Sequence, residues 1–519
     1  MAARASHFGL SDDVDSRNTH ARVAPNGEVG YSVREALLLS LSRVGPKHLT
    51  RGPGRSRTKT TRKPLPSLLF TSRSIVKPIQ FAYPLILAVL VATWLLADSL
   101  APEPFTYFAF RTVFMQFSGV IAIGVMSVAM LLAVRPRWLE SRLNGLDKMY
   151  RLHKWLGITA LVVSGLHWWW AQGTRWMVQW GWLVRPQRRQ GPAVEVAGVE
   201  GWLRGQRDLA ESIGEWAFYA AVVLMVLALV KRFPYHLFTK THKWLAAAYL
   251  ALVYHSVVLV KFPYWGQPAG VLLAVLMAVG TGCALWVLAG RIGAGRKVSG
   301  HIESLTYYPE LRVLETAIAL APGWPGHGAG QFAFAMSDPG EGPHPYTIAS
   351  AWDPAHPRIV FITKALGDHT GRLRERLTVG MPVTVEGPYG RFAFIDTPPR
   401  QIWVGAGIGV TPFIARMKEL ARTPGDKPVD LFHPTADFSE AAIAKLTADA
   451  EAAGVRLHLL TGNKDGRLDG DRIRAAVPEW RSASLWFCGP PAFGAALRQD
   501  FIAQGLAARH FHQELFQMR

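Results

Sequence analysis

Four histidines stand in long apolar stretches, where an ionisable side chain is costly and usually functional. His153 and His167 are 14 residues apart in one stretch, and His242 and His255 are 13 apart in a later one. At about 1.5 Å per residue, each pair spans about 20 Å of helix, within a hydrocarbon core of about 30 Å. The four imidazoles therefore form two layers, each with one ligand from each helix. This arrangement suits two b-type haem irons held from above and below.

Helical geometry fits the first pair better than the second. Fourteen residues at about 100° each return to within about 40° of the same face, whereas thirteen leave His242 and His255 about 140° apart. Either the two haems approach the later helix from different azimuths, or that helix is locally rewound. A hydrogen bond between helices is the alternative role for a single membrane histidine. Two matched layers favour haem ligation.

Six apolar spans are expected to position these histidines, at about 79–98, 112–134, 150–172, 210–230, 238–260 and 269–290. Basic connections at 135–148 and 231–240, and a basic segment after 290, indicate cytoplasmic ends and two cytoplasmic termini. The loop 171–208 should then lie outside, although it holds Arg175, Arg185, Arg188, Arg189, Arg204 and Arg207. We expect a multi-pass protein of the type found in a bacterial inner membrane.

Composition agrees with a bilayer as the main partner. A formal charge of +20 and a pI near 10.1 fit either nucleic acid or a membrane surface. The apolar blocks decide for the membrane, so no nucleic-acid partner is expected. Residues 1–76 are expected to form a basic, disordered cytoplasmic arm, with a short helix around Val33–Ser42. Two cysteines, Cys283 and Cys488, exclude a disulfide scaffold and a cysteine-ligated zinc or iron–sulfur site.

Two soluble domains are predicted after the membrane domain of residues 77–292. Short strand-like runs split by glycine and proline over 297–398 predict an antiparallel β-barrel. Strands alternate with helices over 399–519, which predicts a parallel α/β sheet of nucleotide-binding type.

The segment His344–Ser350, HPYTIAS, lies on a predicted barrel strand and suits a flavin. Tyr346 supplies an aromatic face, and Thr347 supplies a hydroxyl for the flavin N5. His344, followed by Pro345, supplies a positive group for phosphate. A strand ending in a turn explains the segment equally well on its own.

The segment Lys364–Leu373, KALGDHTGRL, lies at a predicted helix start. It begins with Lys364, and the backbone amides of Gly367 and Thr370 suit a pyrophosphate. A strand that ends in a turn is again the alternative.

The segment Ile402–Pro412, IWVGAGIGVTP, is a strand that enters a glycine-rich turn. Small residues let backbone amides approach a pyrophosphate at a helix N-terminus, although the spacing departs from GxGxxG. Thr411 is expected to cap the helix, with Pro412 as its first residue. The candidate nucleotide-binding residues are Gly405, Gly407, Gly409, Thr411 and Pro412.

The segment Leu485–Pro491, LWFCGPP, places Cys488, Gly489 and Pro490 at a strand end, where such sheets bind ligands. A small buried thiol is the alternative. The chain ends FHQELFQMR, with Glu514 and Phe516 expected on a final strand.

Together these motifs resemble the ferric reductase and NADPH oxidase superfamily over about 79–519. The two histidine pairs, HPYTIAS, VEGPYG at Val385–Gly390, GAGIGVTPF, FCGPP and the acid–x–aromatic terminus carry the resemblance. It implies a six-helix transmembrane haem bundle, an FAD-binding β-barrel and an NAD(P)-binding domain. It also implies that Thr347, Cys488, Glu514 and Phe516 surround the hydride-transfer centre.

The resemblance implies an NAD(P)H oxidase or ferric-chelate reductase that uses FAD, two b-type haems, and NADPH or NADH. Oxygen-reducing relatives carry another histidine where this chain has Ala171, so oxygen and a ferric chelate both stay open as acceptors. The arginine that selects NADPH is replaced by Phe432-His433-Pro434, so the nucleotide also stays open. The alternatives are a cytochrome b that feeds a periplasmic partner protein and a membrane scaffold with structural histidines.

Overall fold

The computed structural model describes residues 78–186, 196–230, 232–462 and 464–514. The expected arm, its short helix at Val33–Ser42 and Phe516 lie outside the described residues.

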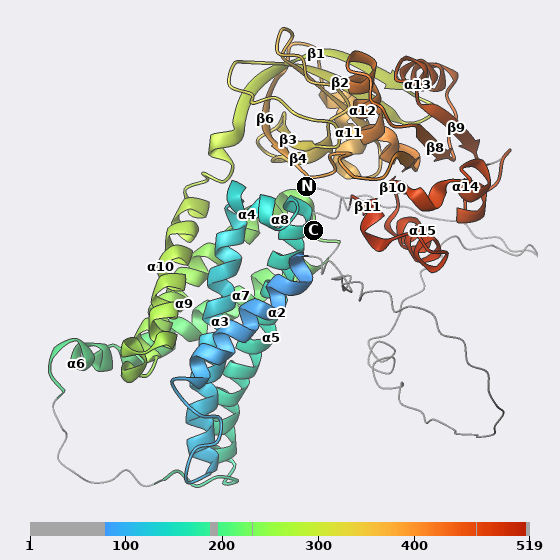
Figure 1. Ribbon diagram of the computed structural model, residues 1–519. Helices are drawn as coiled ribbons and strands as arrows, with labels where there is room; N and C mark the ends of the chain where they lie inside the picture. Colours follow the sequence, from blue (N-terminus) through green and yellow to red (C-terminus); the bar gives the residue numbers. More distant parts are fainter. Residues whose placement is uncertain (1–77, 187–195, 231, 463, 515–519) are drawn as a thin grey trace, which may run out of the picture. The chain divides into compact units, whose positions relative to one another are not determined.

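Helices overlap all six predicted spans (Figure 1). They are α2 (Pro78–Leu95), α3 (Tyr107–Ala133), α5 (Leu146–Gln179), α7 (Arg207–Leu229), α9 (Leu245–Leu259) and α10 (Pro268–Leu288). Within the described residues, α3, α7 and α10 are long and apolar enough to cross a membrane. The helices thus form a membrane-type domain, and a bundle with six crossings stays a prediction. The shorter helices are α4 (Arg137–Arg142), α6 (Gly198–Gly205) and α8 (Tyr235–His242).

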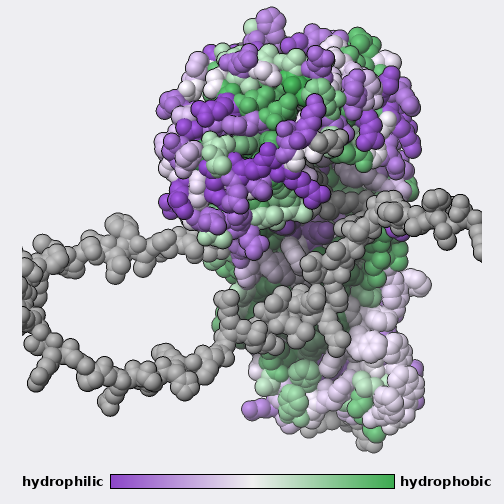
Figure 2. All heavy atoms as spheres, turned by 90° about the vertical axis from the view of Figure 1, so that its right-hand side faces the viewer, coloured by the Kyte–Doolittle hydropathy of each residue, from purple (hydrophilic) through white to green (hydrophobic). Residues whose placement is uncertain are grey.

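The surface of the helices has the apolar character that a bilayer requires. Large hydrophobic side chains are exposed on α7 and α10, including Trp216 at 73%, Val223 at 58% and Val271 at 58%. Figure 2 shows hydrophobic colours gathered over the helices, while hydrophilic residues dominate over the sheets on the face turned to the viewer. Contiguous exposed apolar surface of this kind marks contact with lipid or another apolar partner.

The fifth predicted span consists of two helices, α8 and α9, and not of one. Between them the N–H groups of Trp244, Ala246 and Ala247 donate to the carbonyls three residues earlier, at 3.0 Å each. Such bonds turn the chain by about 120° per residue, compared with about 100° in an α-helix. Of the two alternatives for the 13-residue spacing, the structure therefore shows the local rewinding.

An antiparallel sheet of six strands follows the helices. Its strands are β1 (Lys297–Tyr308), β2 (Val313–Leu320), β3 (Phe332–Met336), β4 (His344–Thr347), β5 (Arg358–Lys364) and β6 (Pro382–Tyr389), in the order β4-β3-β6-β1-β2-β5. An isolated bridge between Ile348 and Phe361 links the two edges. The sheet is antiparallel, as predicted. Whether it closes into a barrel stays a prediction. Helix α11 (Asp368–Arg376) follows β5.

A parallel sheet of five strands forms the C-terminal part, as predicted. Its strands are β7 (Arg400–Gly405), β8 (Val429–Thr435), β9 (Arg456–Thr461), β10 (Ala483–Cys488) and β11 (Phe511–Gln513), in the order β11-β10-β7-β8-β9. The helices α12 (Thr411–Arg422), α13 (Glu440–Ala452), α14 (Gly470–Ala476) and α15 (Pro491–Ala503) connect them. Trp403 and Phe413 belong to one buried cluster, and Phe487 and Phe501 belong to another. The strand order reverses between β7 and β10, which is the topological switch point.

Candidate functional site

The carboxyl ends of β7 and β10 meet at the switch point of the parallel sheet. Gly405 ends β7 and pairs with Cys488, which ends β10. The Ala406 N–H donates to the Cys488 carbonyl at 2.9 Å, and a Cβ at Gly409 would stand 2.2 Å from that oxygen. Only glycine permits this close approach, so the glycine-rich turn and the Cys-Gly-Pro turn share one crevice. Open α/β sheets bind their ligands in such a crevice.

The helix after the glycine-rich turn starts one residue earlier than expected. A 3₁₀ turn, η3, spans Gly407–Val410, and α12 begins at Thr411. The prediction of Thr411 as the cap is therefore wrong, because its hydroxyl donates to the Ile408 carbonyl at 2.7 Å. Pro412 takes the second helical position, where the missing N–H breaks no intrahelical bond.

Cys488 and Glu514 lie at the same edge of this sheet. The expected position of Glu514 on the last strand is wrong, since β11 ends at Gln513. The Glu514 N–H still donates to the Phe487 carbonyl at 3.3 Å, next to Cys488. Burial raises the pKa of the Cys488 thiol well above its ordinary value, and the ionised form of Glu514 raises it further. Cys488 is therefore a neutral thiol, and it is only 2% exposed within the buried cluster that contains Trp403 and Phe413.

Glu514 is a buried carboxyl that holds its proton at neutral pH. Burial, and next the carboxylate of Asp147, raise its pKa to about 8, while Lys148 opposes the shift. Asp147 and Lys148 stand in the first turn of α5, the helix that carries His153. Glu514 can therefore donate a hydrogen bond at pH 7, which an ionised carboxylate cannot.

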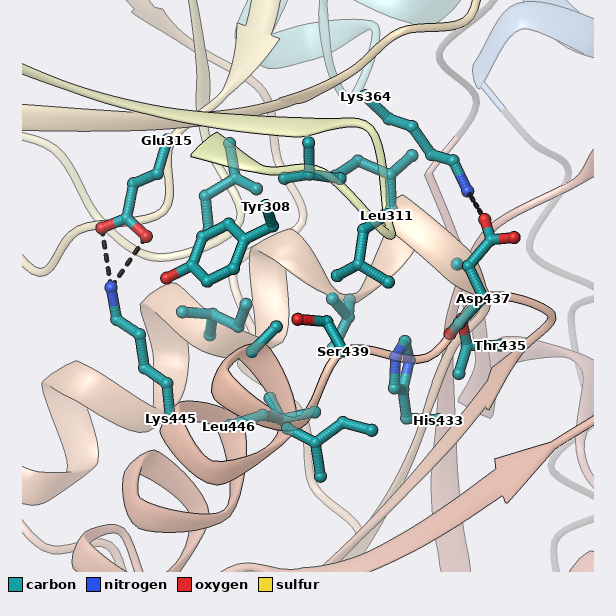
Figure 3. A pocket seen from close by; sticks show the side chains of 18 of the residues that line it. Tyr308, Leu311, Glu315, Lys364, His433, Thr435, Asp437, Ser439, Lys445 and Leu446 are labelled. Atoms are coloured by element: carbon teal, nitrogen blue, oxygen red, sulfur yellow. Dashed lines mark hydrogen bonds and ion pairs between the residues drawn. The ribbon is translucent and has the colours of Figure 1, made fainter. Parts of the chain in front are cut away.

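A pocket opens beside this crevice between the two sheets (Figure 3). Its walls come from β1, β2 and β5 on one side and from η3, α12, β8 and α13 on the other. Figure 3 shows Tyr308 and Ser439 between two ion pairs. Lys364 bonds Asp437 at 2.5 Å, and Lys445 bonds Glu315 at 2.7 Å. Gly407 of the glycine-rich turn also lines the pocket, so a nucleotide held by that turn can extend into it.

His344 of the predicted flavin strand is in contact with His369 of helix α11. The rings of His344 and His369 stack 3.6 Å apart, and the hydroxyl of Tyr346 lies 2.9 Å from His369 Nε2. His344 Nε2 is buried without a hydrogen-bond partner in the described part of the chain. A phosphate oxygen of FAD would satisfy this nitrogen. Ligand atoms of Glu341, His344 and His369 lie within 4.8 Å of one another, so the same group could also hold a metal ion.

The pyrophosphate segment forms the expected helix start, because α11 begins at Asp368. The N–H groups of Leu366 and Gly367 both donate to the hydroxyl of Thr370, at 3.0 and 3.2 Å. Thr370 thus orders this turn with its side chain. Lys364 forms an ion pair with Asp437, so its positive charge is already partly neutralised.

The membrane histidines form two facing pairs. The ring centroids of His153 and His242 are 6.0 Å apart, and those of His167 and His255 are 6.5 Å apart.

Three of the four imidazoles are oriented through Nδ1. The Nδ1 atoms of His153 and His255 lie 3.0 and 2.8 Å from the carbonyls of Ala129 and Ala210. His167 Nδ1 lies 2.9 Å from the Ser118 hydroxyl. Metal-bound histidines usually have this second bond, which leaves Nε2 for the metal. His242 Nδ1 is buried without a partner among the described residues.

One glycine makes room for the pair formed by His167 and His255. A Cβ at Gly214 on α7 would stand 2.0 Å from His255 Nδ1. Helix α7 can therefore approach this imidazole only with glycine at that position. The donor set and its support fit haem iron.

Other expected residues have definite places. Thr347 ends β4 and pairs with Phe332 of β3, in the antiparallel sheet. Gly489 has φ of +159° and follows Cys488. Pro490 precedes α15 as its N-cap.

Sequence reasoning missed three residues of the site. His369 lies within KALGDHTGRL and would have stood out as a second imidazole near phosphate. Asp437 follows β8, the position at which an acidic residue of a nucleotide fold meets ribose. Asp147 gives no local signal, because its nearness to Glu514 depends on the tertiary fold.

Comparisons with known proteins give one family model and several relatives that each match part of the chain. Residues 118–253 match the family model described as ferric reductase like transmembrane component. An NADPH oxidoreductase of Mycobacterium tuberculosis is 34% identical over 145 residues, 26% of this chain and 37% of that protein. The ferredoxin–NAD(+) reductase component of the Xanthobacter autotrophicus alkene monooxygenase system is 28% identical over 187 residues, 34% of this chain and 55% of that protein.

The chain spans about half the length, or less, of these curated relatives. Among solved structures, the flavohemoglobin of Malassezia yamatoensis with bound FAD and heme covers 79% of this chain and 97% of its own, at 18% identity and a TM-score of 0.40. The chain therefore joins a segment that matches a ferric-reductase-like transmembrane model to relatives of the ferredoxin reductase type, a combination consistent with a flavocytochrome like the ferric reductases and NADPH oxidases.

Proposed function

We propose that the protein moves electrons across a membrane, from cytoplasmic NAD(P)H through FAD and two b-type haems to an acceptor on the outer face. The two facing histidine pairs carry this proposal. Their side chains lie on helices of a ferric-reductase-like domain, and three of them have the supporting Nδ1 contact of a metal ligand. A scaffold with structural histidines would not need two such layers.

Each group has candidate holders in this chain. His153 and His242 would hold the inner haem, and His167 and His255 the outer one. FAD would lie against Tyr346 and Thr347, with its phosphates at His344 and at the start of α11. When bound, FAD turns the two electrons of a hydride into single electrons, which haem iron carries onward.

The protein residues at the crevice position the donor and exclude water. The glycine-rich turn and the turn after Cys488 admit the nucleotide, and Cys488 contacts it with a neutral thiol. Glu514 keeps a proton beside them at neutral pH. Two histidines on each iron would leave no open iron position, so the acceptor would be reduced at the haem edge. Oxygen, giving superoxide, and a ferric chelate are the candidate acceptors.

The same assignment divides the chain into 77–292 for the haem domain, 297–398 for FAD and 399–519 for the nucleotide, with both termini cytoplasmic.

A second candidate is a cytochrome b that donates to a periplasmic partner protein. The Trp-rich outer half of α5 and the exposed Trp202 of α6 favour it, since exposed aromatic side chains are typical of protein contacts.

NADH is the donor that the pocket favours. Asp437 stands just beyond β8, and an acidic group at that place accepts bonds from the ribose hydroxyls of NADH. The same charge repels a 2′-phosphate, and the neighbouring Lys364 is already paired with it. The arginine expected for NADPH is replaced at Phe432-His433-Pro434.

An anaerobic addition of NADH to the purified protein tests the proposal. The optical bands of FAD should bleach first and those of reduced b-type haem should follow, with about two haems per chain. Pulses of oxygen or ferric citrate then reoxidise the haem, and the faster one identifies the acceptor. Reoxidation by neither, together with rapid reoxidation by a periplasmic extract, would favour the partner protein. A folded, haem-free protein would refute the proposal.

A further inference from the structure

The connection between α3 and α5 meets the antiparallel sheet through a buried ion pair. Arg135 Nη1 lies 2.7 Å from Glu386 Oε1, and the two side chains are only 14% and 5% exposed. The hydroxyl of Tyr389 donates to the same carboxylate oxygen at 2.7 Å. Since breaking a buried pair leaves an uncompensated charge, Arg135 and Glu386 fix each other's position firmly.

Arg135 adopts an unusual backbone conformation to reach this carboxylate. Its φ is +56°, in the left-handed region, directly after Val134 at the end of α3. Glycine is the usual residue at such a position, because any Cβ adds strain there. A strained, buried arginine at a site that would favour glycine points to a requirement for the guanidinium.

The guanidinium of Arg135 lies between the flavin strands and the helix of the inner histidine. It stands 4.4 Å from the Phe334 ring centroid on β3 and 5.6 Å from that of Tyr150 on α5. Phe334 pairs with Glu386 on one side and with Pro345 of the flavin strand on the other. Tyr150 precedes His153 by three residues, which places both on one side of α5.

A second ion pair repeats the contact nearby. Arg296, just before β1, bonds Glu140 of α4 at 2.9 Å, with side chains 11% and 10% exposed. The Gly390 N–H, next to β6, donates to the other oxygen of Glu140 at 3.3 Å. Leu146 and Met149 of α5 complete the contact, since they share a buried cluster with Phe332, Phe334 and Tyr389.

We propose that Arg135 is a positioning residue for electron transfer from the flavin to the inner haem. With Glu386 it sets the register between the strand of Pro345 and the helix of His153, while Glu140 and Arg296 prevent rotation about that contact. The inference rests on the proposed function, in which those two elements hold FAD and the inner haem. A displacement near 1 Å between reacting groups can cost about a hundredfold in rate.

Stopped-flow spectroscopy on the full-length protein, loaded with FAD and haem, tests this role. Arg135→Gly removes the guanidinium and relieves the backbone strain, and Arg137→Gln is the matched control. Arg137 lies in the same connection, but its guanidinium bonds only the Gly295 carbonyl at 3.2 Å among the described contacts. In Arg135→Gly we expect flavin bleaching by NADH within twofold of wild type, unchanged haem content, and haem reduction slowed by about ten- to a hundredfold. Arg137→Gln should match wild type.

Charge reversal provides the rescue. Arg135→Glu and Glu386→Arg should each slow haem reduction, and the double variant should recover at least part of the rate. Limited trypsin digestion gives a readout independent of electron transfer. Cleavage in the linker 289–297 should be faster in Arg135→Gly and Arg135→Glu than in the double variant.

Three results separate the outcomes. Wild-type haem reduction in Arg135→Gly, or a double variant no faster than either single variant, would overturn the positioning role. If wild-type haem were not reduced by NADH, the proposed function would fail. If trypsin then cleaved the linker equally fast in wild type and Arg135→Gly, the proposed contact between Arg135 and Glu386 would also be overturned.

Discussion

His242 ends α8 and His255 lies within α9, so these two histidines are on separate helices joined by a tight 3₁₀ turn. Their partners His153 and His167 share the single helix α5. The turn at Lys243 and Trp244 changes the azimuth between the helices. Both imidazoles therefore reach α5, with ring centroids 6.0 and 6.5 Å from their partners.

Gly214→Ala should remove one haem and leave the other. The added Cβ would stand 2.0 Å from His255 Nδ1 and displace that ring, while His153 and His242 are untouched. Pyridine haemochrome analysis should fall from about two haems per chain to about one. Gly282→Ala on α10, where a Cβ meets nothing within 4 Å, is the control. Two haems in Gly214→Ala would show that haem binding does not depend on the close approach of α7 to this ring.

Cys488→Ala should slow flavin reduction much more than it weakens nucleotide binding. The thiol stands at the end of β10, beside Gly405 and Glu514, where the donor must be oriented. We expect bleaching by NADH to slow about ten- to a hundredfold, with nucleotide affinity nearly unchanged. Stopped-flow absorbance measures the rate of flavin bleaching, and equilibrium titration measures the nucleotide affinity. Cys283→Ala is the control, and equal bleaching rates in the two variants would leave Cys488 a packing role only.

Glu514→Gln should remove a pH dependence from flavin reduction. The pKa of Glu514 is raised to about 8, so its proton is present below that pH and is lost as pH rises through it. The wild-type rate should therefore fall above pH 8, whereas the glutamine variant should be flat. Asp147→Asn removes a charge that raises this pKa, so its inflection should move to lower pH. A glutamine variant with the wild-type inflection would assign the titration to another group.

Periodicity and local motifs predicted most of the elements, because these depend on neighbouring residues. Five of the six apolar stretches became single helices, the fifth became α8 and α9, and the antiparallel and parallel sheets lie in the predicted ranges. The sequence did not decide whether the helix is rewound near Lys243, because a rewound helix and a continuous one have the same hydrophobic pattern.

The site was predictable where one segment supplies the chemistry. The glycine-rich turn and Cys488 are examples, and Thr411 failed only in its role at the helix start. The pairing of Arg135 with Glu386 joins residues 251 apart in the chain, and Asp147 meets Glu514 from an even greater separation. Such contacts follow from tertiary packing, and no local pattern encodes them.

Asp437→Arg should shift the nucleotide preference toward NADPH. The carboxylate accepts from the ribose of NADH and repels a 2′-phosphate, and arginine reverses both effects. The ratio of kcat/KM for NADH over NADPH should fall at least about tenfold, equivalent to about 1.4 kcal/mol. Lys364→Met breaks the same ion pair but keeps the carboxylate, so it should retain the NADH preference. A ratio changed equally by both variants would point to the ion pair and not to ribose recognition.

FAD binding should strengthen as pH falls, because His344 must gain a proton to pair with phosphate. Burial, followed by the neighbouring His369, lowers the pKa of His344 to about 4, so the imidazole is neutral at pH 7 before FAD arrives. The negative pyrophosphate favours the charged imidazole and raises this pKa in the complex. Binding therefore takes up a proton between the two pKa values.

The affinity for FAD should accordingly increase by up to about tenfold for each pH unit on going from pH 8 toward pH 5. Flavin fluorescence titration of the FAD-free protein measures it. His344→Arg carries a permanent charge, so it should bind FAD more tightly at pH 8 and with little pH dependence. His356→Gln changes a histidine whose side chain is 85% exposed and paired with Asp353, and it should keep the wild-type slope. If His344→Arg kept that slope as well, the proton taken up on binding would belong to another group, with His369 the nearest candidate.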